Sequence, residues 1–317
     1  MTSLEQLLQQ LRDTDFAVDR LEREIGDHRE DQLYLLNAEA VKKRRNDLER
    51  RLHDELRSTQ SDLVEYHVMR TGPQRYPALA VAKAISGFQE LVTAVFDAIR
   101  TTPKQRYRPS ADNIELSTLD FAMALPVGSV VVSMSIENER LIVLQSELDQ
   151  TFERVFKILK TKDSEELRAI ASEVGIASIS KAHDWAESAA QYGLSTSIVV
   201  RKDQENQSVF EISNVEALAL KEAIEEKSEK TVVPDIVSGE LVGIDVELPN
   251  TYFHIKTVDG RNLDGKLADT FPVNQEWAVH VHYIARLLRV TTVKYATGEE
   301  KIEWLLAELD NVSPPLR

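Results

Sequence analysis

Three histidines in the C-terminal third have the clearest potential for metal chemistry. His280 and His282 are two residues apart on a predicted strand, so they would share one face, and His254 lies on another predicted strand. Three imidazoles can hold a divalent cation. The alternation with Val279 and Val281 is, however, what a half-exposed strand shows. We therefore expect no bound metal and no other cofactor.

A second catalytic pattern overlaps the first. Asp245 or Glu247, followed by His254 and Lys256, resembles the order of residues in metal-dependent nucleases, although a histidine stands where those enzymes have a glutamate. A metal-dependent hydrolase or nuclease is therefore an alternative function for this chain.

Other catalytic patterns are absent or weak. The sequence has no Gly-x-Ser-x-Gly motif, no Gly-Lys-Ser/Thr after Gly128, and no cysteine for a nucleophile or a thiolate metal site. His183 and Asp184 are adjacent on a predicted helix and cannot orient one another, which favours a capping or surface role. These patterns together favour a non-enzymatic protein.

Two basic segments are candidate anion-binding surfaces. The first is a loop without acidic residues, in which cations would meet phosphate and a tyrosine would stack on a base; its residues are Arg100, Lys104, Arg106, Tyr107 and Arg108. The second comprises Lys42, Lys43, Arg44 and Arg45, but acidic residues within one or two helical turns favour a salt-bridged solvent face. A nucleic-acid-binding subunit is therefore another alternative, for example in a bacterial multi-gene system such as phage defence, although no residue is diagnostic of one.

The composition limits these alternatives. The 317 residues include 38 basic and 53 acidic side chains, and a net charge of -15 disfavours a general binder of nucleic acid or anionic membranes. With 42% hydrophobic residues and no apolar run of membrane-spanning length, the chain is typical of a soluble protein of two or three domains. The N-terminal residues do not resemble a secretory signal, so we expect a cytoplasmic protein.

Residues 1–71 are predicted to form a coiled-coil-like helical hairpin. Between Ser3 and Arg70 there is no proline and one glycine, and the reversal is expected at residues 26–31. The second helix, residues 32–70, would reach roughly 58 Å, about twice the length of the first. Its apolar stripe is Leu33, Leu36, Val41, Leu48, Leu52, Leu56 and Leu63.

The uncovered half of this stripe predicts self-association, with a dimer favoured and with Leu48, Leu52 and Leu56 at the interface. The alternative is that the long helix packs wholly within one chain.

Residues 72–230 are predicted to form an α+β domain. A buried helix begins at Pro77, two strands surround a turn at Gly128, and helices cover 148–159, 165–173 and 178–192, with Gly193 as C-cap. The first of those two strands is expected to include Ile114 and Leu116. Strands at 195–200 and 209–212 then precede a helix that begins at Asn214 and reaches about residue 230.

Residues 231–317 are predicted to form a small β-barrel closed by a C-terminal helix at 299–309. Short strands, two of them expected at 277–288 and 290–295, together with glycines and the Asp259-Gly260 turn, give this segment a pattern that resembles SH3-like or Sm-like barrels. The resemblance implies an interaction module that recruits a partner protein. The preferred function is therefore a cytoplasmic assembly or adaptor protein with two association surfaces.

Overall fold

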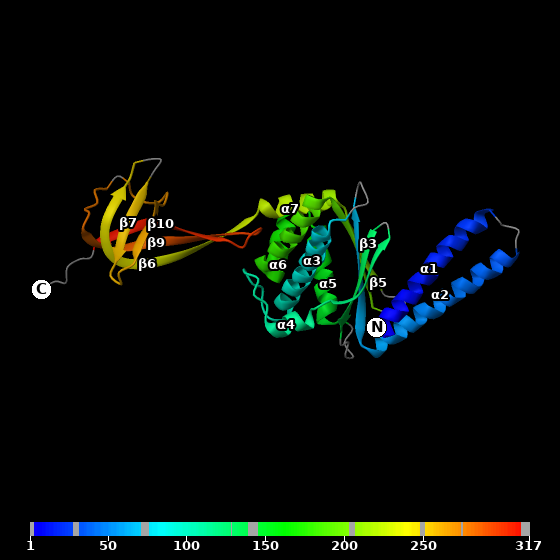
Figure 1. Ribbon diagram of the computed structural model, residues 1–317. Helices are drawn as coiled ribbons and strands as arrows, with labels where there is room; N and C mark the ends of the chain where they lie inside the picture. The colour runs from blue at the N-terminus through cyan, green and yellow to red at the C-terminus, as the bar shows by residue number, and fades with distance from the viewer. Residues whose placement is uncertain are drawn as a thin grey trace. The chain divides into compact units, whose positions relative to one another are not determined.

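The computed structural model describes residues 3–27, 32–70, 76–127, 129–138, 145–202, 207–247, 251–273 and 275–311 (Figure 1). It divides the chain into two compact units, Met1–Glu225 and Glu226–Arg317. The protein is mixed α and β, with a helical pair at the N-terminus and strands at the C-terminus. The boundary between the units lies slightly before residue 231, where the composition changes.

The N-terminal helices are nearly equal in length. Helix α1 covers Ser3–Asp27 and helix α2 covers Gln32–Ser58. The prediction of a helix over residues 32–70 is wrong beyond Ser58, because Ser61–Arg70 forms strand β1. Gln60, with φ +49°, turns the chain between them. The strand follows from the alternation of Val64, Tyr66 and Val68, which are all buried on one face.

Strand β1 is the centre of a five-stranded antiparallel sheet, in the order β2-β3-β1-β4-β5 within the described residues. The two predicted hairpins are confirmed, and they comprise β2 (Asp120–Val127), β3 (Ser129–Glu137), β4 (Leu194–Arg201) and β5 (Gln207–Ile212). Ile114 and Leu116, expected on a strand, lie instead on the short helix α4, Ala111–Leu116, and are exposed.

Four helices cover one face of the sheet: α3 (Ala78–Arg100), α5 (Glu147–Lys160), α6 (Ser164–Tyr192) and α7 (Asn214–Glu225) (Figure 1). Tyr66 joins the sheet to these helices. Its hydroxyl accepts a hydrogen bond of 2.8 Å from the Trp185 indole and donates one of 3.3 Å to the carbonyl of Ala84. Complete burial raises the pKa of Tyr66 to about 12.

The helix boundaries follow local signals. Helix α6 is kinked at Gly175, which separates the two helices predicted at 165–173 and 178–192. Gly193 is the left-handed C-cap, as predicted. Helix α7 is capped by Ser213 rather than by Asn214, because Ser213 and Glu216 exchange side-chain to backbone hydrogen bonds in a capping box. Helix α7 ends at Glu225, and the chain is already a strand at residue 228.

The opposite face of the sheet carries the root of the helical hairpin, defined here as the part of α1 and α2 nearest the sheet (Figure 1). Its leucines form a buried cluster with Leu63 of β1, against which Ala122 and Met123 of β2 pack. The cluster contains Leu7, Leu8, Leu11, Leu48, Leu52, Leu56 and Leu63. These leucines are therefore buried within a single chain.

The second unit is a closed barrel of five strands, in the order β10-β8-β7-β6-β9 within the described residues. The strands are β6 (Ser228–Asp245), β7 (Tyr252–Thr257), β8 (Asn262–Leu267), β9 (Val281–Lys294) and β10 (Glu300–Asn311). Phe253, Leu241 and Leu287 lie in its core. Gly260 adopts φ +85° in the turn predicted at Asp259-Gly260.

Two predictions for the barrel are wrong. The strands expected at 277–288 and 290–295 are one continuous strand, β9, and the helix expected at 299–309 is strand β10. A β-bulge explains the second error. Leu306 pairs with Leu287 and Leu309 with Ala285, so one extra residue of β10 is inserted between them. Residues three apart consequently both face the core, which reproduces helical spacing in a strand.

Candidate functional site

The basic loop, residues 100–109, is held in place by a buried carboxylate. Asp97 on α3 is 3% exposed. Its Oδ2 accepts a hydrogen bond of 2.5 Å from the Lys104 ammonium, and its Oδ1 accepts one of 2.7 Å from the Asn113 amide. Burial opposes ionisation of Asp97, but the hydrogen bonds from Lys104 and Asn113 outweigh it and lower the pKa. Lys104 is thus a structural partner of Asp97.

The same loop caps the second half of α6. The carbonyl of Lys104 accepts a hydrogen bond of 3.0 Å from the Ala177 amide, just after the kink at Gly175. The Lys104 ammonium also donates to the carbonyl of Arg108 at 3.1 Å. The loop therefore gives the Ala177 amide, at the start of the second half of α6, a hydrogen-bond partner.

Tyr107 is already covered by a cation of its own chain. The Lys181 ammonium lies 4.9 Å from the centre of the Tyr107 ring. Lys181 is in turn paired with Glu90 at 2.8 Å and with Asp184 at 3.1 Å. Burial and the nearby Glu90 charge raise the pKa of the Tyr107 phenol. Lys181 therefore occupies one face of the Tyr107 ring, and a base cannot stack on that face.

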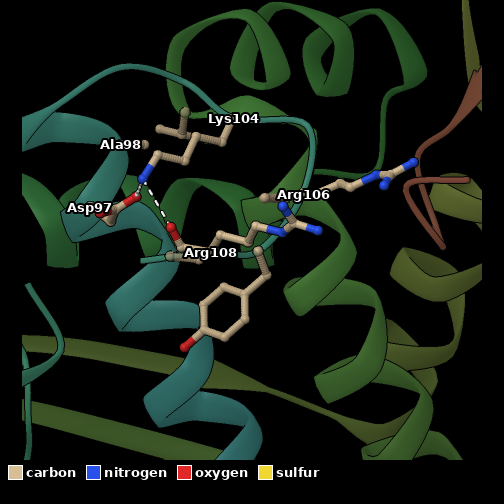
Figure 2. Close-up of a pocket in the computed structure, with 9 residues that line it drawn as sticks. Asp97, Ala98, Lys104, Arg106 and Arg108 are labelled. Carbon is tan, nitrogen blue, oxygen red and sulfur yellow. Dashed lines mark hydrogen bonds and ion pairs between the residues drawn. The ribbon is translucent and has the colours of Figure 1, made fainter. Parts of the chain in front are cut away.

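The remaining cations of the loop divide into two groups. Arg100 is paired with Glu147 at 3.1 Å and with Asn113 at 3.2 Å. Arg106 and Arg108 are exposed, and neither has an ion pair with any described residue. Figure 2 shows both side chains extending away from Asp97. Of the five predicted contact residues, these two arginines are therefore the ones available to a ligand.

The hollow beside this loop is too small for a small-molecule ligand. It is lined by Asp97, by apolar residues of α3 and α6, and by four residues of the loop, Lys104, Arg106, Tyr107 and Arg108 (Figure 2). Its volume is about 10 Å³, which is space for a single water molecule. A ligand of Arg106 and Arg108 must therefore bind on the surface.

The second basic segment is a salt-bridged face of α2. Lys42 pairs with Glu22 at 2.8 Å, and Arg45 pairs with Asp15 at 2.5 Å. Only Lys43 and Arg44 of this run remain exposed without an ion pair among the described residues. The ion pairs of Lys42 and Arg45 with acidic residues of α1 link the two helices of the hairpin.

The three barrel histidines do not form a metal site. His254 is paired with Asp264, and His280 with Glu240 at 2.8 Å. His280 precedes β9 and adopts φ +62°, so the strand alternation on which the prediction relied does not extend to it. No group of three metal-binding side chains occurs in the part of the chain that the structure describes. His254, His280 and His282 are therefore not gathered into one three-ligand group among the described residues.

His183 is buried rather than on the surface. Its Nε2 lies 3.2 Å from the Glu225 carboxylate, which joins α6 to α7. Asp184, whose Oδ1 is 3.9 Å from the His183 Nδ1, and then Glu225 raise the pKa of the imidazole, although burial opposes them. His183 is therefore a contact between helices.

The hairpin carries an exposed apolar surface that was not predicted from the sequence. Leu33 and Leu36, here called the tip leucines, were assigned to a buried stripe, but they are 70% and 62% exposed. Phe16 on α1 and Leu35 on α2 are also exposed. No signal in the sequence separates the tip leucines from Leu52 and Leu56, because all four belong to the predicted helical stripe.

Comparisons with known proteins give no match. No family model, curated protein or solved structure matches this chain. Among the described helices, α3 alone has the length and apolar composition of a membrane span, and half of that stretch is buried within the protein. Phe88, Leu91 and Val95 of α3 are fully buried, as in the core helix of a soluble protein.

Proposed function

We propose that this protein is a non-enzymatic assembly protein, which self-associates through the tip of its hairpin and recruits a partner protein through its barrel. The exposure of the tip leucines carries the proposal. Leu33 and Leu36 are separated by about one helical turn, so they form one apolar patch. The root leucines are buried against the sheet, and the tip leucines are not.

A second copy of the chain is the occupant that fits this patch. Each helix of a two-helix layer buries only the stripe that faces the other helix, and outward leucines need a further layer. Burial of each tip leucine contributes about 2 kcal/mol. The nearby Arg20–Glu24 and Lys42–Glu22 pairs carry both signs of charge, so two hairpins can approach despite the net charge of -15.

The barrel supports the second part of the proposal. Val232 and Ile236 of β6 are exposed and share a face, because they are four residues apart on one strand. Ile284 of β9 is also exposed, and its cross-strand partner Ser238 is two residues from Ile236. A partner that recognises these apolar side chains would bind the outer face of the barrel. That an SH3-like barrel serves this purpose rests on analogy between folds.

Light scattering during size exclusion tests the self-association. We expect the mass of two chains for the full-length protein and of one chain for the Leu33→Asp/Leu36→Asp variant, because two carboxylates oppose burial of the patch. Leu79→Asp is the matched control: Leu79 is an exposed leucine on α3, and this variant should remain dimeric.

A monomeric full-length protein, or an unchanged mass for the tip variant, would contradict the proposal. Circular dichroism should show that both variants stay folded. Absorbance at 260 and 280 nm on the same peak adds a further readout, since a high ratio would show bound nucleic acid and favour that alternative.

A further inference from the structure

Arg106 and Arg108 are two cations without a structural role in the described chain. Lys104 forms an ion pair with Asp97, Arg100 forms one with Glu147, and Lys181 lies over the Tyr107 ring. The two arginines have no such partner among the described residues, and their side chains extend away from Asp97 on one side of the loop (Figure 2). Both guanidinium groups are therefore available to a ligand at the surface of the loop.

The loop that carries them is ordered before any ligand binds. Lys104 fixes it through its ammonium, which bonds Asp97 and the Arg108 carbonyl, and through its own carbonyl, which accepts from Ala177. Pro103 and Pro109 restrict the backbone further. Binding therefore costs little backbone entropy, and only the two arginine side chains need to be ordered.

We infer that Arg106 and Arg108 bind an acidic segment of a partner protein, with each guanidinium group holding one carboxylate. Arginine binds carboxylates through two parallel N–H donors, and two arginines that extend on one side of the loop can hold two of them. This site lies in the first unit and is independent of the tip leucines. Failure of the self-association proposal therefore leaves this inference intact, and the reverse also holds.

The structure favours a peptide over other anionic ligands. The net charge of -15 repels a nucleic acid and an acidic peptide alike at long range, so the distinction rests on the loop itself. Lys181 lies over one face of the Tyr107 ring and occupies a surface on which a base could stack. A small-molecule anion would have no enclosed space, since the neighbouring hollow holds about one water molecule. A short run of aspartate or glutamate needs neither a pocket nor a stacking surface.

Fluorescence anisotropy with a labelled peptide of eight glutamates tests the inference on the full-length chain. We expect binding at low salt that weakens at physiological salt. The Arg106→Gln/Arg108→Gln variant should bind about tenfold more weakly, because two exposed charge pairs are lost. Lys43→Gln/Arg44→Gln is the matched control, since it removes the same charge from two exposed cations on α2 and should change affinity by less than about twofold.

Three outcomes would overturn the inference. They are no binding of the peptide by the unmodified chain, an equal loss in both double variants, and tighter binding of a labelled eight-nucleotide thymidine strand than of the peptide. Circular dichroism and thermal melting should be unchanged in both variants. Neither pair of cations makes an ion pair with a described residue, so a loss of affinity can be assigned to the binding surface.

Discussion

Gly175 is the residue on which the position of the basic loop most depends. Its φ of +83° and ψ of 155° lie in a region that is essentially restricted to glycine, and another residue there costs about 1 to 3 kcal/mol. A Cβ atom would also lie 2.4 Å from both the amide nitrogen and the carbonyl oxygen of Lys104. These are backbone atoms, so the loop itself must move. The 3.0 Å hydrogen bond from Ala177 to Lys104 would then be lost, at about 1 kcal/mol.

Gly175→Ala should therefore reduce the free energy of unfolding by roughly 2 to 4 kcal/mol. Gly193→Ala on the same helix is the control, because Gly193 also has a positive φ, +64°, but its Cβ would meet nothing within 4 Å. We expect that control to cost about 1 kcal/mol.

Urea unfolding followed by circular dichroism at 222 nm measures both values, since all the described helices belong to the first unit. If the two variants differ by less than about 1 kcal/mol, the contact between Gly175 and the Lys104 backbone does not hold the loop, and the reasoning is refuted.

Two further predictions concern the packing of the first unit. Leu52→Ala should lower the free energy of unfolding in urea by about 2 to 5 kcal/mol, because Leu52 is 2% exposed in the root cluster. Leu36→Ala should lower it by less than about 0.5 kcal/mol. Similar values for the two variants would contradict the assigned burial. The pKa of His183 is raised in the folded chain, so its contribution to stability is complete below the unfolded pKa of about 6.5 and is lost as the pH rises through the folded value. Glu225→Gln should lower the His183 pKa measured by NMR titration, and an unchanged pKa would exclude Glu225 as a cause.

The sequence predicted most helices and hairpins of the first unit because their signals are local. The error at β1 has a specific cause. Leu63 lies seven residues after Leu56, so the apolar stripe of α2 continues in phase into the strand, and both leucines enter the same buried cluster. The alternation of Val64, Tyr66 and Val68 was the competing signal, and pairing with β3 and β4 on both sides determined the outcome.

The error at β10 has a similar origin. Ile302, Leu305, Leu306 and Leu309 are spaced as on a helix, and Glu, Leu and Ala favour helices locally. Closure of the barrel overrides this preference, since β10 pairs with both β9 and β8. A bulge cannot be read from a single sequence, because it depends on the strand that lies opposite.

The candidate site was predictable in composition but not in its contacts. The sequence identified the basic loop and its five residues. It could not show that Lys104 forms an ion pair with Asp97, seven residues earlier, or that Lys181 of α6 lies over the Tyr107 ring. Both contacts depend on how α3 and α6 pack. Together with the pairing of Arg100 to Glu147, these contacts leave Arg106 and Arg108 as the predicted contact residues whose side chains are available to a ligand.

The position of a leucine along the hairpin separates its role in folding from a role in assembly. A carboxylate at Leu52 would be placed in the buried root cluster and would unfold the first unit, so loss of an oligomer in such a variant would not identify an interface. Carboxylates at Leu33 and Leu36 remain in water in the single chain, where they cost little. They become unfavourable only when a second hairpin covers them. A change of mass in the tip variant with unchanged circular dichroism therefore reports assembly alone. Substitutions at Leu33 and Leu36, rather than at Leu52, are for this reason the ones that test self-association.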